Sequence, residues 1–369
     1  MTAPGTGVTE RVAAVTIAKW TKKVSDLAVQ KFAFSKMLEA KKRIKFGCGG
    51  GEIRWPVRYR DHEITGYVDM ASKNFQRVNT LKNAVLEHRG YEATEAISLK
   101  EKLQNGGDND ATIVKIFKNR EKDVRTGLMR ALGKRWHADG DSTVGTAERR
   151  FHGILSFSST TGQTASDKYA TTPNDTYAGH GTGYTSLQAS AVSGDAEYGA
   201  WSPTIVNCNR NPGSGTRAWD TYADEYIRSG IIGASFGAMQ EDNLDMILLN
   251  KSAYEDLCNV ADDKERLNFK RGEGVGMVKM GFTQFMELDG CQIGWDFGVP
   301  AATEGGTVVH GFGYNFDRLE LQMLNKSQIW EVIPDWNSTQ AADLLYFYSL
   351  GNLKFESPKF HALFLEISS

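Results

Sequence analysis

The clearest pattern in the chain is a period-two alternation that follows a glycine run at positions 47, 49, 50 and 51. The apolar positions are Ile53, Trp55, Val57 and Tyr59, and they alternate with Glu52, Arg54, Arg58 and Arg60. This alternation predicts a β-strand with one apolar face. Pro56 cannot donate to a strand ladder, which favours an edge strand in a two-stranded ribbon whose return strand lies within residues 77–93. Such a ribbon is marginal in water, so it either contacts a neighbouring subunit or folds back on its own body.

A second pattern, with helical spacing, precedes the glycines. Its apolar stripe consists of Trp20, Val24, Leu27, Phe34 and Leu38. These steps of three, four and seven residues predict an amphipathic helical arm. This pattern fits two alternatives. The arm packs on its own body, or it lies against another molecule.

A long helix is predicted over residues 110–137, after a polar loop at 105–110. Its apolar face carries Ile113, Phe117, Val124, Leu128, Leu132 and Trp136. At 1.5 Å per residue the helix would be about 40 Å long. The segment Asp139-Gly-Asp141 after it fits a helix-ending turn at least as well as a site for a hard cation.

The second half of the chain has a mixed pattern of helices and strands. A short apolar, strand-like run at 151–157 leads into a long polar loop at 158–199. A helix is then predicted at 217–228 and another from about 252. Predicted strands are 244–249, 285–288, 291–297, 308–311, 319–324, 329–333, 344–350 and 360–367.

Composition narrows the class of protein. The 369 residues suggest about two structural units, and 40% hydrophobic with 24% charged residues is typical of a soluble globular protein. Apolar runs are too short to span a bilayer, and Met1–Gly7 does not resemble a signal peptide, so we expect a cytosolic protein. The four cysteines and seven histidines lack the spacing of metal ligands. We therefore predict free thiols, no metal site and no cofactor.

The charge is unevenly distributed. The net charge is −2, yet the first 45 residues contain ten Lys and Arg against three acids, which gives +7 there and −9 in the remainder. Lys41, Lys42, Arg43 and Lys45 are candidates for electrostatic contact with nucleic acid or a neighbouring subunit, and a solvated helix face is the alternative. The glycine-rich stretch 271–276 lacks the context of a phosphate loop, so we interpret it as a flexible loop.

The order of these elements resembles the major capsid protein of tailed bacteriophages, with the Hong Kong 97-type fold. The resemblance covers nearly the whole chain. Segments that carry it are 245–250 leading into the helix at 252, 288–293, 298–300, 306–311, 351–353 and 357–362. The resemblance implies an α+β fold with an N-terminal arm (1–46), an extended β-hairpin loop (47–104), a peripheral domain with a spine helix (105–200), a mixed α/β axial domain (201–340) and C-terminal strands that return to the peripheral domain (341–369).

The resemblance also implies a function. The chain would self-assemble as hexamers and pentamers into an icosahedral shell around a double-stranded DNA phage genome, without catalysis, cofactor or membrane. Its expected partners are portal, scaffolding and decoration proteins and non-specifically contacted packaged DNA, and its expected location is the virion, assembled in the host cytoplasm. Alternatives are an encapsulin-like compartment shell and a soluble α+β cytosolic enzyme.

Assembly contacts are expected in the arm and the ribbon. Candidates for inter-subunit contact are Trp20, Phe34, Leu38, Arg54, Trp55, Arg58, Tyr59 and Arg60. Arginine is suited to this role because its planar guanidinium can bind a carboxylate through two hydrogen bonds. The alternative for the ribbon residues is a set of cross-strand contacts within one chain.

Overall fold

The structure is a computed structural model. It describes residues 32–58, 66–67, 69–70, 77, 80–106, 110–141, 150–157, 175–182, 201–209, 218–235, 242–264, 286–303, 306–326, 329–337 and 342–367.

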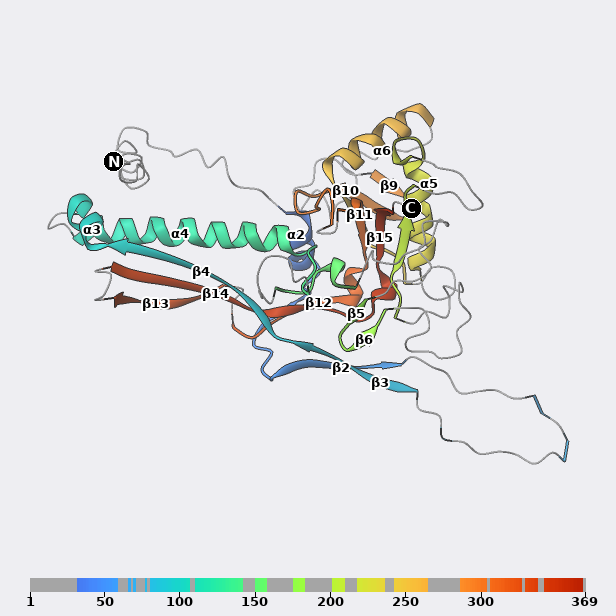
Figure 1. The fold of residues 1–369 in the computed structure, drawn as a ribbon, viewed down its shortest axis with the longest axis horizontal. Coiled ribbons are helices and arrows are strands. Elements are labelled where there is room, and N and C mark those ends of the chain that lie inside the picture. Colours follow the sequence, from blue (N-terminus) through green and yellow to red (C-terminus); the bar gives the residue numbers. More distant parts are fainter. Residues whose placement is uncertain are drawn as a thin grey trace. The chain divides into compact units, whose positions relative to one another are not determined.

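The chain separates into two compact units, which are described in turn (Figure 1). The described part of the first unit comprises residues 90–106, 110–132, 325–326, 329–337 and 342–350. The other described residues form the second unit.

The first unit combines a long helix with three strands. Its helices are α3 (Leu99–Gly106) and most of α4 (Asp110–Arg135). Its strands are most of β4 (Arg89–Ser98), β13 (Trp330–Asn337) and the first part of β14 (Ala342–Phe355). β14 pairs with both β4 and β13, and α4 runs alongside these strands in Figure 1. Leu128 and Leu132 of α4 are buried, as the predicted apolar stripe requires.

The second unit is built around a six-stranded sheet with the order β7-β15-β11-β8-β10-β9. The strands are β7 (Thr204–Asn207), β8 (Met246–Leu249), β9 (Met286–Leu288), β10 (Cys291–Trp295), β11 (Val308–Tyr314) and β15 (Ala362–Glu366). β10–β8 and β15–β7 are parallel pairs, and the other neighbours are antiparallel. β8 and β7 are buried along their whole length, because both faces of the sheet are covered.

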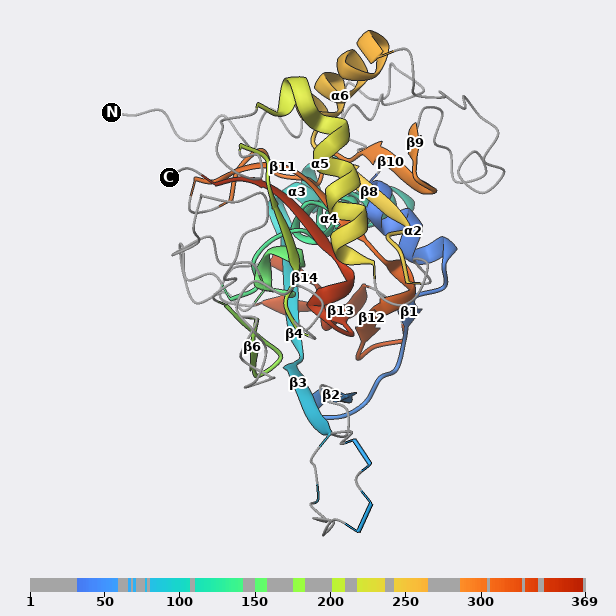
Figure 2. The same cartoon turned by 90° about the vertical axis from the view of Figure 1, so that its right-hand side faces the viewer.

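Two helices complete this core. α5 (Trp219–Ala234) packs on β7 and β15 and against α6 (Lys251–Lys264), and Figure 2 shows α5 lying across the sheet. Gly230 allows the close approach of α5, because a Cβ there would lie 2.4 Å from the Phe364 ring of β15. The apolar residues of α5, α6, β8 and β10 form one contiguous core.

Smaller elements surround the sheet. Helix α2 (Ala33–Ala40) precedes β1 (Ile44–Lys45), which pairs in parallel with β12 (Leu319–Met323), and β12 pairs with the end of β14. β2 (Glu52–Arg58) and β3 (Leu81–Glu87) form a ribbon, and β5 (Thr176–Tyr177) and β6 (His180–Gly181) form a short hairpin. The 3₁₀ turns are η1 (Ile154–Phe157), η4 (Phe316–Arg318) and η5 (Pro358–Phe360).

Most of the predicted elements are confirmed. The ribbon alternates as expected, with Ile53 and Trp55 buried and Arg54 and Arg58 exposed. The return strand β3 lies inside the predicted range, and α4 begins at the predicted residue. Of the predicted arm helix, the described part is α2, and the predicted loop 271–276 lies outside the described residues.

Three local predictions are wrong. Residues 99–106 form α3, although 105–110 were predicted as a polar loop. In the apolar run 151–157, Ile154–Phe157 form the 3₁₀ turn η1, and no residue of the run pairs in a ladder, so the run is not a strand. The described parts of the predicted loop 158–199 contain the hairpin β5–β6.

The two units divide the chain differently from the predicted domains. The described residues 325–326 and 329–337 group with the first unit, whereas the predicted axial segment ran to 340. Of the C-terminal segment 341–369, the first part of β14 groups with the first unit, and β15 lies in the six-stranded sheet between β7 and β11. The return of this segment to a peripheral domain stays a prediction. Residues 362–365 are all buried, which is typical of a strand covered on both faces.

Candidate functional site

The end of the predicted arm is anchored in the core of the second unit. The Phe34 ring lies among Trp136, His137, Tyr314 and Phe316, with ring centroids 4.9 Å from Tyr314 and 5.5 Å from Phe316. Its side chain is 0% exposed. A residue this deeply buried offers no surface to another molecule without local unfolding.

A distant carboxylate holds the first turn of α2. Phe32 at the N-cap has no polar side chain, and the buried carboxylate of Asp296 accepts the Phe34 N–H at 2.9 Å and the Gly298 N–H at 2.9 Å. Burial raises the pKa of Asp296, and the N–H groups of Gly298, Phe34 and Ala33 oppose that shift. A carboxylate at the N-terminus of a helix is stabilised by the unpaired N–H groups there.

These findings correct the prediction for two arm residues. Phe34 and Leu38 were expected to contact a neighbouring subunit, and both are buried within their own chain. Phe34 and Leu38 therefore follow the alternative prediction, in which the arm packs on its own body. Trp20, Tyr59 and Arg60 lie outside the described residues.

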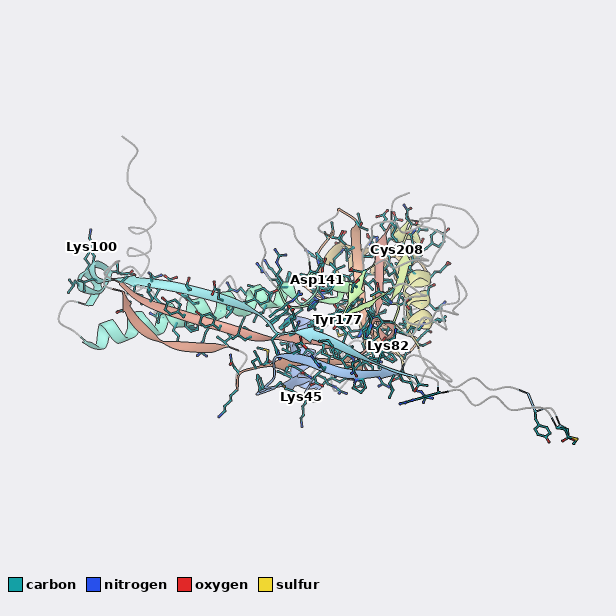
Figure 3. The ribbon with its side chains drawn as sticks, turned by 60° about the horizontal axis from the view of Figure 1, so that its bottom comes forward. Lys45, Lys82, Lys100, Asp141, Tyr177 and Cys208 are labelled. Atoms are coloured by element: carbon teal, nitrogen blue, oxygen red, sulfur yellow. The ribbon has the colours of Figure 1, made fainter. Side chains whose placement is uncertain are left out.

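The basic residues after α2 pair with acids of the same chain. Lys41 Nζ lies 2.8 Å from Asp245 Oδ1. The Nζ of Lys45, a residue labelled in Figure 3, lies 3.0 Å from Glu320 Oε2. The Arg43 guanidinium binds Asp317, whose pKa is lowered by Arg43 and Lys41 in spite of partial burial. Lys42 is exposed and has a left-handed backbone with φ 55°. Three of the four candidates for nucleic-acid or neighbour contact thus neutralise acids of the second unit.

Aromatic contacts fix the base of the ribbon. Trp55 lies 6.5 Å from Trp201 between ring centroids, Trp201 stacks on Tyr177, and the Lys354 ammonium lies over the Trp55 ring. The Trp55 Nε1–H donates to the carbonyl oxygen of Glu356 at 3.0 Å. The paired part of the ribbon therefore folds back on its own unit, which was the alternative to contact with a neighbour, and the inter-subunit prediction for Trp55 is corrected.

The hairpin β5–β6 covers the outer edge of β3. The Val85 N–H donates to Ala178 O at 3.1 Å, and His180 Nε2 donates to Asn83 O at 2.9 Å. Both backbone groups of β3 therefore point away from β2, so Asn83 and Val85 occupy the non-hydrogen-bonded positions of the ladder. Pro56 pairs opposite Asn83, and its missing N–H removes no bond between the two strands.

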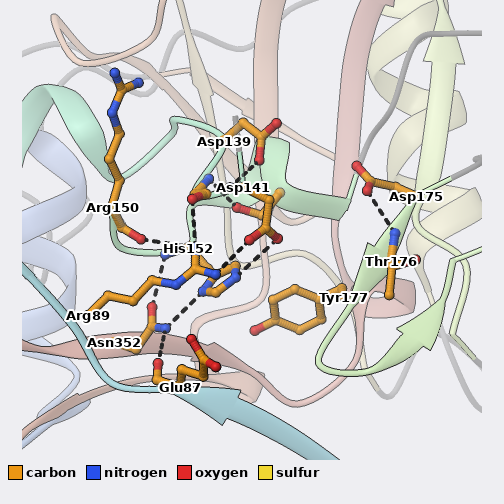
Figure 4. A network of polar contacts seen from close by, with 12 residues as sticks. Glu87, Arg89, Asp139, Asp141, Arg150, His152, Asp175, Thr176, Tyr177 and Asn352 are labelled. Carbon is orange, nitrogen blue, oxygen red and sulfur yellow. Dashed lines mark hydrogen bonds and ion pairs between the residues drawn. The ribbon is translucent and has the colours of Figure 1, made fainter. Parts of the chain in front are cut away.

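A partly buried polar network joins the ribbon to the turn after α4 (Figure 4). Arg89 donates to Gly140 O at 2.6 Å, to Arg150 O at 3.3 Å and to Asp141 Oδ1 at 2.6 Å. His152 Nε2 lies 3.2 Å from Asp141 Oδ2. Burial would raise the pKa of Asp141, but hydrogen bonds from His152 and Arg89 and the positive charge of Arg89 lower it to about 2.

Asn352 determines the orientation of His152. Its Oδ1 accepts the backbone N–H groups of His152 and Leu353, each at 2.9 Å. Its Nδ2 group must therefore be the donor to Glu87 O and to His152 Nδ1, each at 2.8 Å. His152 Nδ1 is then an acceptor, which leaves Nε2 to carry the proton that binds Asp141. The donor and acceptor roles of Asn352 and His152 therefore fix one another.

Sequence reasoning identified only a small part of this network. The segment Asp139-Gly-Asp141 forms the predicted turn, in which Asp139 Oδ1 accepts the Asp141 N–H at 2.9 Å. Among the described residues no cluster of three His, Cys, Asp or Glu could hold a metal ion. Arg89, His152, Asn352 and Trp201 were missed, since the pattern around each gives no signal of a partner far along the chain.

The turn of the β5–β6 hairpin is strained, and this gives a prediction. Ala178 and Gly179 have φ 52° and φ 80°, as a two-residue hairpin turn requires. A left-handed residue other than glycine costs roughly 1–2 kcal/mol, and glycine loses roughly 0.5–1 kcal/mol more entropy on folding. We expect Ala178→Gly to raise the free energy of unfolding by about 0.5–1 kcal/mol in urea denaturation.

The control for this prediction is Ala131→Gly, in the regular helix α4. It should lower the free energy of unfolding by about 1 kcal/mol. If Ala178→Gly destabilises the protein as much as Ala131→Gly does, the left-handed turn carries no strain.

Two further sequence expectations can be compared with the structure. Cys48, Cys208, Cys258 and Cys291 are free cysteines, as predicted. In the part of the chain that the structure describes, no helix combines the length and apolar character needed to cross a membrane.

Comparison with known proteins identifies the fold. No protein-family model matches the sequence, and no curated protein matches it. A chain in the capsid of the native GTA particle is 11% identical with a TM-score of 0.56, and the match covers 94% of this chain and 95% of that one. A chain in the cyanophage A-1(L) capsid is 14% identical with a TM-score of 0.55, and the match covers 95% of this chain and 98% of that one. A chain in the capsid of cyanophage P-SCSP1u is 10% identical with a TM-score of 0.52, and the match covers 94% of this chain and 91% of that one.

At these identities the likeness concerns the fold. It extends over nearly the full length of both chains in each comparison. The mixed α and β architecture described above therefore has the fold of tailed-phage capsid proteins, which confirms the resemblance seen in the sequence.

Proposed function

We propose that the chain is the major capsid protein of a tailed phage, with the Hong Kong 97-like arrangement of arm, extended loop, spine helix and axial domain. It self-assembles as hexamers and pentamers into an icosahedral shell around double-stranded DNA, and its role is structural and non-catalytic. The observation that carries the proposal is the fold match to the GTA particle capsid over 94% of this chain and 95% of that one. That neighbour is described as a capsid with C5 symmetry.

A shell-forming role also implies which partners the chain has and where it is found. Portal, scaffolding and decoration proteins are the expected protein partners, and packaged DNA is contacted without sequence reading. The protein resides in the virion after assembly in the host cytoplasm. Large interfaces between obligate subunits commonly bury more than about 2,000 Å², which would stabilise exposed features such as the outer face of the ribbon.

Two arginines on that outer face remain proposed assembly contacts. Arg54 and Arg58 are exposed on β2, four residues apart on the same face. Arg54 donates from Nε at 2.9 Å and from Nη2 at 2.7 Å to Glu52 Oε2, which holds the Arg54 guanidinium along the strand. We propose that both guanidinium groups bind carboxylates of an adjacent subunit.

Electron microscopy of the purified chain tests the function. The chain is expressed alone and together with any neighbouring scaffold gene, and closed particles are expected. Encapsidated nucleic acid supports a capsid, whereas an enclosed enzyme supports an encapsulin-like compartment. A compact monomer under both conditions overturns the shell and favours a cytosolic enzyme.

The arginine contacts give a separate prediction. The double substitution Arg54→Glu with Arg58→Glu should leave the free energy of unfolding within about 1 kcal/mol, since both side chains are exposed. The yield of closed particles should fall by at least about tenfold, because like charges would face each other across the interface. Sedimentation of assembly reactions measures this yield.

The matched control is Arg228→Glu with Lys251→Glu, which makes the same charge change on α5 and α6. Both side chains are exposed in the second unit. Particle yield should stay close to that of the wild type. An equal loss in both double variants would show that net charge, and not the ribbon face, limits assembly.

A further inference from the structure

The hairpin that covers the ribbon is closed by its own ends. Asp175 donates its N–H to Thr182 Oγ1 at 3.1 Å, and the Thr182 N–H donates to Asp175 O at 2.8 Å. Ser202 Oγ then donates to Thr182 O at 2.7 Å. Residues 175–182 therefore form a small closed loop whose position depends on the conformation at Asp175. We call this loop the clasp.

The clasp is attached to the ribbon by a few polar contacts. Ala178 O accepts the Val85 N–H at 3.1 Å, and His180 Nε2 donates to Asn83 O at 2.9 Å. On its inner side, Tyr177 stacks on Trp201, whose ring also lies next to Trp55. Opening the clasp would therefore expose the outer edge of β3 to solvent or to another strand.

Three carboxylates approach one another at the start of the clasp. Asp139 and Asp141 face Asp175 from the turn after α4, and the positive side chain of Arg89 and the ring of His152 bind Asp141 (Figure 4). Asp175 itself accepts the Thr176 N–H at 2.7 Å. The ionised form of Asp175 is thus repelled by Asp139 and Asp141, and Arg89 offsets part of the charge of Asp141.

We propose that residues 175–182 are a proton-dependent clasp, which lies closed on the edge of β3 while Asp175 is protonated and loosens when Asp175 ionises. This inference concerns the single chain and does not depend on the proposed shell.

Linkage gives the direction and the pH range. Burial, together with repulsion by Asp139 and Asp141 and in spite of the Thr176 N–H, raises the pKa of Asp175 to about 7 in the closed form. In an open clasp the pKa would return to about 4. Closure is then strongest below about pH 4 and weakens as the pH rises toward about 7, where it levels off. Asp141, with its pKa lowered to about 2, stays ionised throughout this range.

Hydrogen exchange at the Val85 amide tests the clasp. This N–H is bonded to Ala178 O, so it exchanges only when the clasp opens locally. Between about pH 5 and about pH 7, the protection of the β3 peptide, corrected for the intrinsic exchange rate, should fall about tenfold in the full-length chain. Linkage allows up to about tenfold per pH unit, and the partial exposure of Asp175 reduces this.

Asp175→Asn is the principal variant. An asparagine oxygen can still accept the Thr176 N–H, but the side chain has no charge to gain, so protection should not change with pH. Asp139→Asn removes one repelling charge and should shift the midpoint of the wild-type transition to lower pH. Its amide oxygen can also keep the hydrogen bond to the Asp141 N–H.

The proposal is overturned if wild-type protection does not vary between the two pH values, or if Asp175→Asn shows the same variation as the wild type. Should Asp175→Asn fail to fold, the midpoint in Asp139→Asn decides the matter, and an unchanged midpoint counts against the clasp. Particle formation by the wild-type chain is scored separately, so failure of the shell would leave this result unaffected.

Discussion

Replacing Phe34 by alanine is expected to destabilise the second unit by about 3–5 kcal/mol, because it empties a fully buried site. The ring is 0% exposed and lies among four aromatic side chains, with Tyr314 at 4.9 Å between centroids. The Trp136 and His137 rings are themselves buried and have little freedom to fill the space. Urea denaturation of the unassembled chain, followed by tryptophan fluorescence, measures the loss.

Phe297→Ala is the matched control for this prediction. Phe297 follows β10 in the same unit, is 49% exposed and has one described ring contact, with Trp295 at 4.7 Å. Its removal should change the free energy of unfolding by less than about 1 kcal/mol. If Phe34→Ala is no more destabilising than Phe297→Ala, the anchoring of α2 in the core is wrong.

The second large effect is expected for Arg89→Met at the polar junction. Methionine keeps much of the aliphatic volume but removes the donors that bind Gly140 O, Arg150 O and Asp141. Breaking a buried charge pair costs about 3–5 kcal/mol. Because Asp141 is partly exposed, we expect Arg89→Met to lower the free energy of unfolding by about 2–3 kcal/mol. Two carbonyl groups also lose a donor, which adds to the loss.

The effect of Arg89→Met should depend on pH. His152 and Arg89 lower the pKa of Asp141 to about 2 against the effect of burial, so Asp141 contributes stability above its unfolded value of about 4. That contribution disappears as the pH falls from about 4 to about 2. The difference between wild type and Arg89→Met should therefore be full at neutral pH and shrink across this acidic range.

Arg228→Met provides the control at an exposed ion pair. The Arg228 side chain binds Asp289 with an Nε to Oδ2 distance of 3.0 Å, and both are well exposed. Such pairs contribute about 0–1 kcal/mol. An equally small loss in Arg89→Met would contradict the view that the junction stabilises the base of the ribbon.

Local patterns were sufficient to predict much of the fold. The alternation around Trp55 predicted β2, and the apolar stripe through Leu128 and Leu132 predicted α4. Both predictions succeeded because each element has one buried face and one solvated face. The boundary of β14 was harder to place. This strand has 14 residues, and the glycine at position 351 interrupts the pattern while its close approach to β12 requires a residue without a side chain.

The polar junction could not be predicted from local patterns. His152 and Asn352 are 200 positions apart in the chain, and each is an unremarkable polar residue in its own segment. Their roles arise from hydrogen bonds that the tertiary fold creates. For the same reason the sequence could not decide whether the stripe of Phe34 and Leu38 packs on its own chain, since an amphipathic helix has the same pattern in either case.

The anchoring of α2 also constrains the order in which the chain can fold. The carboxylate that holds its first turn is 262 positions further along, and β1, which follows α2, pairs with residues 321 and 322. During synthesis, neither α2 nor β1 has its partner until most of the chain has left the ribosome. Contacts of such sequence separation form slowly, because the intervening chain must first be ordered. The earliest described residues to be synthesised would thus be among the last to reach their native positions, and they would stay accessible to chaperones or proteases in the interval.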